Sequence, residues 1–150
     1  LRIPSPGDRA LVEQSLERVG MADFRTRQIG ELSGGQKKRV FLARALAQES
    51  RIILLDEPFT GIDPIAVSEI QDIIHSLKAQ GMGILISDHN YLETLKICDR
   101  SYILYRGRVV EEGDSQKIFQ SEKAREAYLG TRSLRDSAEK TIARELGTGK

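Results

Sequence analysis

The feature that most constrains the fold of this 150-residue chain is an uninterrupted aliphatic run, Ile52 to Leu55, that leads directly into two acids, Asp56 and Glu57. Continuous rather than alternating apolar residues are typical of a strand that is buried on both faces of a parallel sheet. A second such run spans residues 83–87, and Pro64 suits the first turn of a helix between the two runs. Strand, helix and strand in this order predict an α/β fold with a parallel sheet flanked by helices.

A hairpin and several further helices are predicted from spacing and turn residues. The hairpin turns at Arg106 and Gly107, with strands over 101–105 and 109–111, and we expect it to close the sheet. From residue 131 onwards the chain is polar with few large apolar side chains, so we expect an exposed extension over 131–150. The predicted helices cover residues 8–19, a segment that starts at 33, and residues 64–80, 91–98 and 114–128.

Composition and charge fit a soluble folded domain. The chain carries 23 Lys+Arg and 22 Asp+Glu, a formal net charge of +1, and 39% of its residues are hydrophobic. This near-neutral charge gives no reason to expect a nucleic-acid partner. The single cysteine, Cys98, excludes an internal disulfide, and no apolar run reaches the roughly 20 residues of a membrane span. Because no charged and then apolar leader is visible, we expect a soluble intracellular domain that could be cut from a longer chain.

The first chemical signal is the pentapeptide Leu-Ser-Gly-Gly-Gln at residues 32–36. Ser33 and Gln36 have the spacing of a capping box, which predicts that a helix begins here. Gly34 and Gly35 would let a ligand approach the backbone, and a helix N-terminus offers free N–H groups and the positive end of a dipole. The pattern indicates an anion site with phosphate as its usual occupant, or else a plain helix cap with a glycine turn.

The second signal lies where the two predicted strands end. Ligands bind outside the carboxyl ends of parallel strands, and Asp56 and Glu57 stand there on opposite faces. One acid could hold Mg²⁺ and the other could accept a proton from an attacking water, although a solvated strand end gives the same pattern. His89 follows the next strand and could donate to a phosphate oxygen or polarise a water, or be an ordinary loop histidine.

Taken in this order, residues 8–130 resemble the nucleotide-binding domain of ABC-type ATPases. Residues 32–36 are similar to the ABC signature, and residues 52–57 to the Walker B motif with its catalytic glutamate. Thr60 to Asp63 is similar to the D-loop, and His89 to the switch histidine. The resemblance implies a partial P-loop NTPase fold, with a helical subdomain over about 8–50, a RecA-like core portion over 51–130 and a polar extension over 131–150.

In that family two nucleotide-binding domains close head to tail around ATP, and the resemblance implies a role for each matching residue. Ser33, Gly34, Gly35 and Gln36 would bind the γ-phosphate of ATP held by the partner subunit. On this subunit's own nucleotide, Asp56 would support Mg²⁺, Glu57 would be the general base for the hydrolytic water, and His89 would contact the γ-phosphate. Asp63 would couple the two sites across the dimer. ATP and Mg²⁺ are the implied cofactors.

One family motif is missing from these 150 residues. No Gly-x-x-x-x-Gly-Lys-Ser/Thr loop occurs, and the closest match, residues 147–150, lacks the first glycine and the final Ser/Thr. The adenine-stacking aromatic residue and the Q-loop glutamine, which the family places before the signature, are also absent. We therefore interpret the chain as the C-terminal part of such a domain. We expect no appreciable ATPase activity from this polypeptide alone, and an exposed apolar face or edge beside Ile52 to Leu55.

The subgroup and partners are read from the same resemblance. Residues 59–64, 87–90 and 127–130 are similar to ATPases of lipopolysaccharide export and of branched-chain amino-acid import. Residues 27–31 and 40–44 are more like those of manganese and zinc importers. The resemblance implies an ATP-hydrolysing transporter subunit, cytoplasmic and held at the inner face of the membrane, with a second nucleotide-binding domain and transmembrane permease subunits as partners. The alternatives are an ABC ATPase acting on DNA or the ribosome, and a non-catalytic interaction module.

Overall fold

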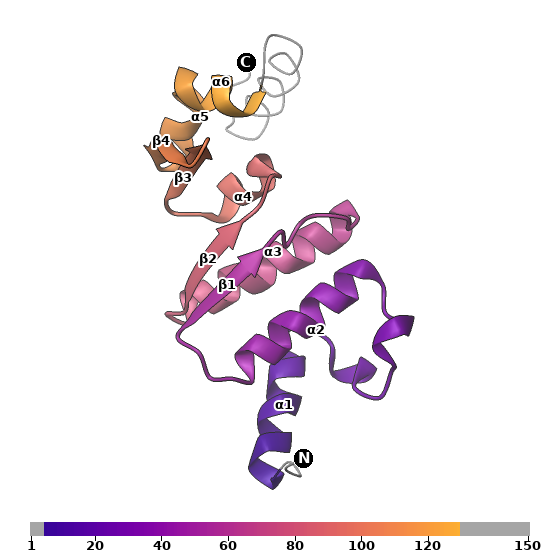
Figure 1. Cartoon of the computed structure of the whole chain (residues 1–150). Coiled ribbons are helices and arrows are strands. Elements are labelled where there is room, and N and C mark those ends of the chain that lie inside the picture. The colour runs from indigo at the N-terminus through magenta and orange to yellow at the C-terminus, as the bar shows by residue number, and fades with distance from the viewer. Residues whose placement is uncertain (1–4, 130–150) are drawn as a thin grey trace, which may run out of the picture. The chain divides into compact units, whose positions relative to one another are not determined.

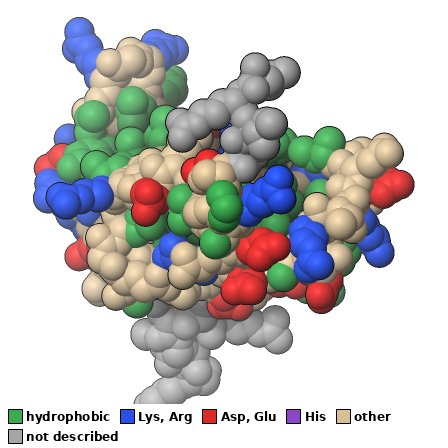
Figure 2. Space-filling view, turned by 90° about the horizontal axis from the view of Figure 1, so that it is seen from below, with side chains coloured by type: hydrophobic (Ala, Val, Ile, Leu, Met, Phe, Trp, Pro, Cys, Tyr) green, Lys and Arg blue, Asp and Glu red, His purple; other side chains and the backbone are tan. Residues whose placement is uncertain are grey.

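The computed structural model describes residues 5–129, which fall into two compact units divided between Ile97 and Cys98. The predicted extension over 131–150 lies outside the described residues. None of the helices within 5–129 has both the length and the hydropathy that a membrane span needs. On the face drawn in Figure 2, basic and acidic side chains are interspersed, in keeping with the net charge of +1.

The first unit contains four α-helices, two short 3-10 helices and two strands (Figure 1). The bounds of the α-helices and strands lie within about two residues of those predicted, whereas the two 3-10 helices were not predicted. The expected α/β fold is confirmed. In chain order these elements are α1 (Pro6–Arg18), η1 (Ala22–Phe24), η2 (Ile29–Glu31), α2 (Gly34–Leu46), β1 (Ile52–Asp56), α3 (Pro64–Ala79), β2 (Gly83–Ser87) and α4 (Tyr91–Ile97).

Strands β1 and β2 pair in parallel, and α3 forms the crossover between them (Figure 1). The register runs from Ile52 opposite Gly83 to Asp56 opposite Ser87. The two strands therefore end at the same level, and the loops that follow them begin side by side.

The prediction that these strands are buried on both faces is wrong for the described chain. Ile53 is only 3% exposed, whereas Ile52, Leu54 and Leu85 are 69%, 67% and 61% exposed. Successive side chains of a strand point to opposite faces, so one face of the pair packs on the core and the other is open. The expected exposed apolar sheet face is thus confirmed.

The core of this unit forms where the end of α1, α2, β1 and α3 meet. Each of its members is less than a tenth exposed, and together they form one apolar cluster. They are Val19, Met21, Leu32, Leu42, Ala43, Leu46, Ile53 and Leu77.

Helix α2 begins at the predicted capping box, which is confirmed. The Ser33 hydroxyl accepts from the Gln36 backbone N–H at 3.2 Å, and the Gln36 side-chain oxygen accepts from the Ser33 backbone N–H at 2.9 Å. Two N–H groups at this helix end are satisfied in this way.

The second glycine of the pentapeptide allows α2 to approach α3 closely. A Cβ on Gly35 would lie 2.5 Å from the Ala66 Cβ, and Gly35 is buried. Gly34 is exposed and lies next to the Gly61 carbonyl oxygen and Ile62, where a Cβ would be 3.4 and 3.3 Å away. The missing Cβ of Gly35 therefore serves helix packing within this chain.

The second unit contains β3 (Ser101–Tyr105), β4 (Arg108–Gly113), α5 (Ser115–Gln120) and α6 (Glu122–Leu129). The predicted hairpin is confirmed: β3 and β4 are antiparallel, and Arg106 and Gly107 both have positive φ, as a tight hairpin turn requires. Within residues 5–129, β3 and β4 form a two-stranded sheet. The expectation that this hairpin closes the parallel sheet stays a prediction.

The helix predicted over 114–128 is interrupted at Ser121. This residue adopts an extended conformation after α5, and its hydroxyl accepts from the Ala124 backbone N–H at 3.3 Å in the first turn of α6. The same hydroxyl donates to a carboxylate oxygen of Glu111 on β4 at 2.8 Å. A serine that can cap a new helix and reach a neighbouring strand explains the break.

We predict that Gly35→Ala lowers the free energy of unfolding by about 1–3 kcal/mol, because the new methyl group overpacks the contact with Ala66. Gly30→Ala is the matched control, since nothing lies within 4 Å of the position that its added methyl group would take, and it should change stability by less than about 0.5 kcal/mol. Urea unfolding measures both. An unchanged Gly35→Ala midpoint would contradict the close approach of the two helices.

We also predict a pH dependence in the second unit. The Ser121 hydroxyl, then the Glu112 backbone N–H and the Lys117 ammonium, lower the pKa of Glu111 from its ordinary value. A lowered pKa means that this contact stabilises the fold at neutral pH and ceases to do so as the pH falls through that pKa. Ser121→Ala should move the pKa of Glu111 back up in an NMR titration. An unmoved pKa would show that the contact does not form.

Candidate functional site

The carboxyl ends of β1 and β2 are joined by two hydrogen bonds beyond the regular ladder. The Ser87 hydroxyl donates to the Asp56 carboxylate, and the Glu57 backbone N–H donates to the Ser87 carbonyl oxygen at 2.7 Å. Pairing thus continues one residue past the end of β1. Asp56 and Glu57 are held at the sheet edge where ligands of parallel sheets bind.

The backbone turns sharply at Glu57, whose φ is +48°. A left-handed conformation is uncommon for a residue with a long side chain and marks a position that its surroundings hold in place. One such partner is Lys38 of α2, whose ammonium donates to the Glu57 carbonyl oxygen. The helix that begins with the pentapeptide is therefore tied directly to the strand end.

The Glu57 carboxylate and the His89 ring meet above this edge. Oxygen Oε1 of Glu57 lies 3.4 Å from Nδ1 of His89, and the two side chains are 56% and 67% exposed. A carboxylate and an imidazole at this distance, both open to solvent, can share a water or a phosphate oxygen. The structure thus brings together two residues that stand 32 positions apart in the sequence.

Asp88 is a buried acid beside the candidate site, and the sequence analysis assigned it no role. Its side chain is 0% exposed and accepts hydrogen bonds from the backbone N–H groups of Phe59, at 2.9 Å, and Asn90, at 2.8 Å. The bond from Phe59 joins the loop after β1 to the loop after β2, and the bond from Asn90 lies within the loop after β2. The sequence offered one indication of a role for Asp88, namely its position between a strand end and a histidine. Its hydrogen bond with the Phe59 backbone could not be predicted, because Phe59 lies far away in the sequence.

The acids at this edge fit magnesium bound together with a nucleotide, and not a metal held by protein alone. Within residues 5–129 no three His, Cys, Asp or Glu side chains gather closely enough to hold a metal ion. Asp56 is exposed, and Oδ1 is the oxygen that accepts from Ser87. Mg²⁺ keeps most of its waters and takes one or two carboxylates plus phosphate oxygens, so a single exposed carboxylate is sufficient.

The other predicted site residues lie at helix starts. Ser33 and Gly34 are exposed at the N-terminus of α2, while the Gln36 side chain is engaged in the capping box. Asp63 caps α3, where its carboxylate accepts from the Ala66 backbone N–H at 3.0 Å. The roles expected for these residues toward a second subunit stay predictions.

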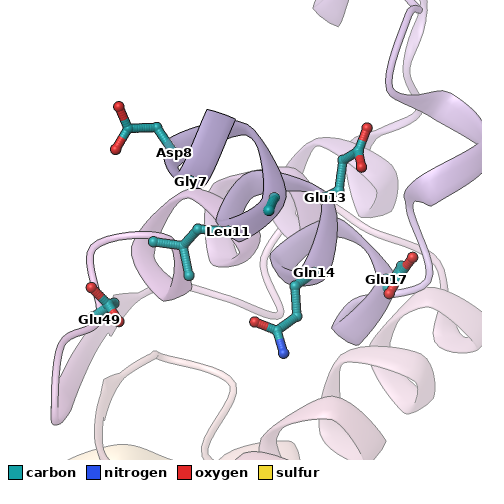
Figure 3. A pocket seen from close by; sticks show the side chains of 8 residues that line it. Gly7, Asp8, Leu11, Glu13, Gln14, Glu17 and Glu49 are labelled. Atoms are coloured by element: carbon teal, nitrogen blue, oxygen red, sulfur yellow. The ribbon is translucent and has the colours of Figure 1, made fainter. Parts of the chain in front are cut away.

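A cavity of about 610 Å³ lies elsewhere, along α1 (Figure 3). Among the described residues, four acids line it together with three small or apolar residues and Gln14, and no Lys or Arg does; the acids are Asp8, Glu13, Glu17 and Glu49. An acidic lining repels a phosphate group, and none of the strand-end residues contributes to it. The candidate site is the strand-end group of Asp56, Glu57, Asp88 and His89, because these side chains converge where the two parallel strands end.

Comparison with known proteins agrees with this geometry. A family model described as ABC transporter matches residues 6–60. A manganese transport system ATP-binding protein, MntA of Synechocystis sp., is 50% identical over 130 residues, which cover 87% of this chain and 50% of the relative. The chain belongs to the ABC transporter ATP-binding family.

Two further comparisons fit this ABC ATP-binding chain. A lipopolysaccharide export system ATP-binding protein, LptB of Acidithiobacillus ferridurans, is 51% identical over 118 residues, covering 79% of the chain and 49% of the relative. The crystal structure of the ADP conformation of MJ1267, an ATP-binding cassette of an ABC transporter, superposes with a TM-score of 0.79 at 30% identity, covering 85% of this chain and 52% of that one. The chain spans about half the length of the relatives it matches.

We predict that Lys38→Met lowers the free energy of unfolding by about 0.5–1.5 kcal/mol, because the Glu57 carbonyl oxygen loses its ammonium donor. Lys37→Met is the matched control, a neighbouring lysine on the same helix, and should have an effect near zero. Chemical unfolding of both variants measures the difference. Equal effects would mean that Lys38 does not secure the strand end.

Proposed function

We propose that this ABC ATP-binding chain is part of the ATP-hydrolysing subunit of a transporter. The observation that carries the proposal is the meeting of Glu57 and His89 at 3.4 Å, at the carboxyl edge of a parallel strand pair in a chain of this family. ABC ATPases bind and hydrolyse ATP, so the γ-phosphate of ATP is the group on which a base and an imidazole at this edge would act.

Glu57 is the proposed general base. Its carboxylate is more than half exposed and can accept a proton from a water placed between it and a phosphate. His89 beside it would contact the γ-phosphate or hold that water in line. Positioning of this kind, together with stabilisation of the developing charge, is most of what phosphoryl-transfer catalysis requires.

Asp56 is the proposed support for Mg²⁺. The ion, bound with the nucleotide, would neutralise charge on the phosphate oxygens. The chain's own contribution is to orient the Asp56 carboxylate at the strand end through the hydrogen bond that Ser87 donates to it.

Ser33, Gly34 and Gly35 are proposed to act on ATP held by a second subunit. The exposed start of α2 presents the Ser33 hydroxyl and backbone N–H groups at the positive end of a helix, which suits a phosphate. A second nucleotide-binding domain and membrane permease subunits are the proposed partners, and they would hold the chain at the cytoplasmic face of the membrane.

A mixing experiment tests this proposal. The partner is an ABC ATP-binding subunit that keeps its glycine-rich phosphate loop but has its own signature serine replaced by arginine. We predict little ATP turnover from either protein alone and Mg²⁺-dependent turnover on mixing, because this chain supplies the missing signature. Ser33→Asp should abolish that turnover: aspartate caps α2 as well as serine does, but its charge repels the phosphate.

Two controls sharpen the result. Glu57→Gln should leave the mixed turnover unchanged, because Glu57 would act on this chain's own nucleotide and not on the partner's. Asp72→Asn, a charge-matched change on the exposed side of α3, should also have no effect. Association by size-exclusion chromatography without any change in turnover would contradict the proposal and favour a non-catalytic interaction module.

For the 150-residue polypeptide alone, we predict no appreciable Mg²⁺-dependent ATP turnover. These residues contain no Gly-x-x-x-x-Gly-Lys-Ser/Thr loop to hold the β- and γ-phosphates next to Glu57. A coupled assay for released phosphate measures the rate. Turnover that disappears on Glu57→Gln would contradict this expectation.

A further inference from the structure

The proposed function leaves one buried acid of the site unused. Asp88 lies between Ser87, which binds Asp56, and His89, which faces Glu57. Its side chain is fully buried, whereas those of Glu57 and His89 are more than half exposed. A buried carboxylate is costly unless it is well hydrogen-bonded, so its surroundings indicate what it does.

Every group that faces Asp88 is a donor or can act as one. Oxygen Oδ2 accepts from the Phe59 backbone N–H at 2.9 Å, and Oδ1 accepts from the Asn90 backbone N–H at 2.8 Å. The Thr60 hydroxyl lies 3.5 Å from Oδ1. An ionised carboxylate only accepts and suits this set, whereas the NH₂ group of an asparagine would face another donor.

The ring of His89 is oriented by the same group of oxygens. Its Nδ1 lies 3.4 Å from the Glu57 carboxylate, 3.5 Å from the Thr60 hydroxyl and 3.8 Å from the Asp88 carboxylate. Two of these three oxygens belong to carboxylates, and ionised carboxylates only accept hydrogen bonds, so this set of neighbours favours a proton on Nδ1. Nε2, on the far side of the ring, is then directed away from the three oxygens.

We propose that Asp88 is a positioning residue that fixes His89 with Nδ1–H facing inward and Nε2 facing outward, and that holds Glu57 within reach of the ring. It does so through its contacts with Phe59 and Thr60, which join the loop after β1 to the loop after β2. The importance of this orientation for turnover rests on the proposed function, but the orientation itself can be measured without a nucleotide.

The orientation has a chemical consequence for His89. A neutral ring with its proton on Nδ1 offers only a lone pair at Nε2, so it can accept a hydrogen bond there but cannot donate one. It would then accept from a water. Only the doubly protonated ring could donate from Nε2 to a phosphate oxygen.

The ¹⁵N NMR shifts of the two histidine rings in the 150-residue chain test the proposal directly, because they report which nitrogen carries the proton. His75, exposed on α3, is the internal reference and should show the ordinary preference for Nε2–H. At a pH where both rings are neutral, His89 should show Nδ1–H as its main form. A wild-type His89 that matches His75 would overturn the proposal.

A variant pair isolates the part played by Asp88. Asp88→Asn should reduce the ratio of Nδ1–H to Nε2–H at His89 by about two- to tenfold, because the ring loses one of its two carboxylate neighbours. It should also speed amide exchange at Phe59 and Asn90, whose N–H groups bond to the Asp88 carboxylate. Asp72→Asn should change none of these, and His75 should be unaffected by either variant. An unchanged His89 ratio in folded Asp88→Asn would overturn the proposal.

If Asp88→Asn does not fold, the comparison is made with Asp88→Glu, which keeps the charge but displaces the carboxylate by one methylene. The ratio of Nδ1–H to Nε2–H at His89 in the wild-type chain then still tests the proposal. These readouts are independent of ATP. Failure of the mixing experiment would overturn the proposed function but would not affect the His89 proton ratio. A wild-type His89 with its proton mainly on Nε2 would overturn only the role proposed for Asp88.

Discussion

The candidate site depends on the parallel pairing of β1 and β2, which sets Asp56 directly opposite Ser87. Because the strands end at the same level, the loops that follow start side by side, and a few hydrogen bonds suffice to join them. The Glu57 backbone bonds to Ser87, and Asp88 reaches back to Phe59. A slip of one residue in this register would move all of these groups out of reach of each other.

The second element of the site is α2, and it connects the pentapeptide with the strand end. At its start, Gly35 allows close packing against α3, and further along the same helix Lys38 donates to the Glu57 carbonyl oxygen. A displacement of the start of α2 would therefore be transmitted to the proposed general base. Under the proposed function, this linkage would connect contact with a partner subunit at the start of α2 to the strand end.

The sequence predicted those features that local chemistry decides. The capping box of Ser33 and Gln36, the helix start at Pro64 and the hairpin turn at Arg106 each depend on residues a few positions apart. Features that depend on distant neighbours were not predictable. Burial of Ile52 and Leu54 depends on what covers that face of the sheet, and the role of Asp88 depends on an amide 29 residues away.

The central claim is that Glu57 and His89 act on one nucleotide at the β1–β2 edge. The most direct test is a structure of the ATPase assembly that contains this chain, with Mg²⁺ and a non-hydrolysable ATP analogue bound. The account predicts the Glu57 carboxylate and the His89 ring within hydrogen-bond reach of the γ-phosphate or of a water in line with it. A nucleotide bound away from this edge, with Glu57 and His89 touching neither its phosphates nor that water, would contradict the account.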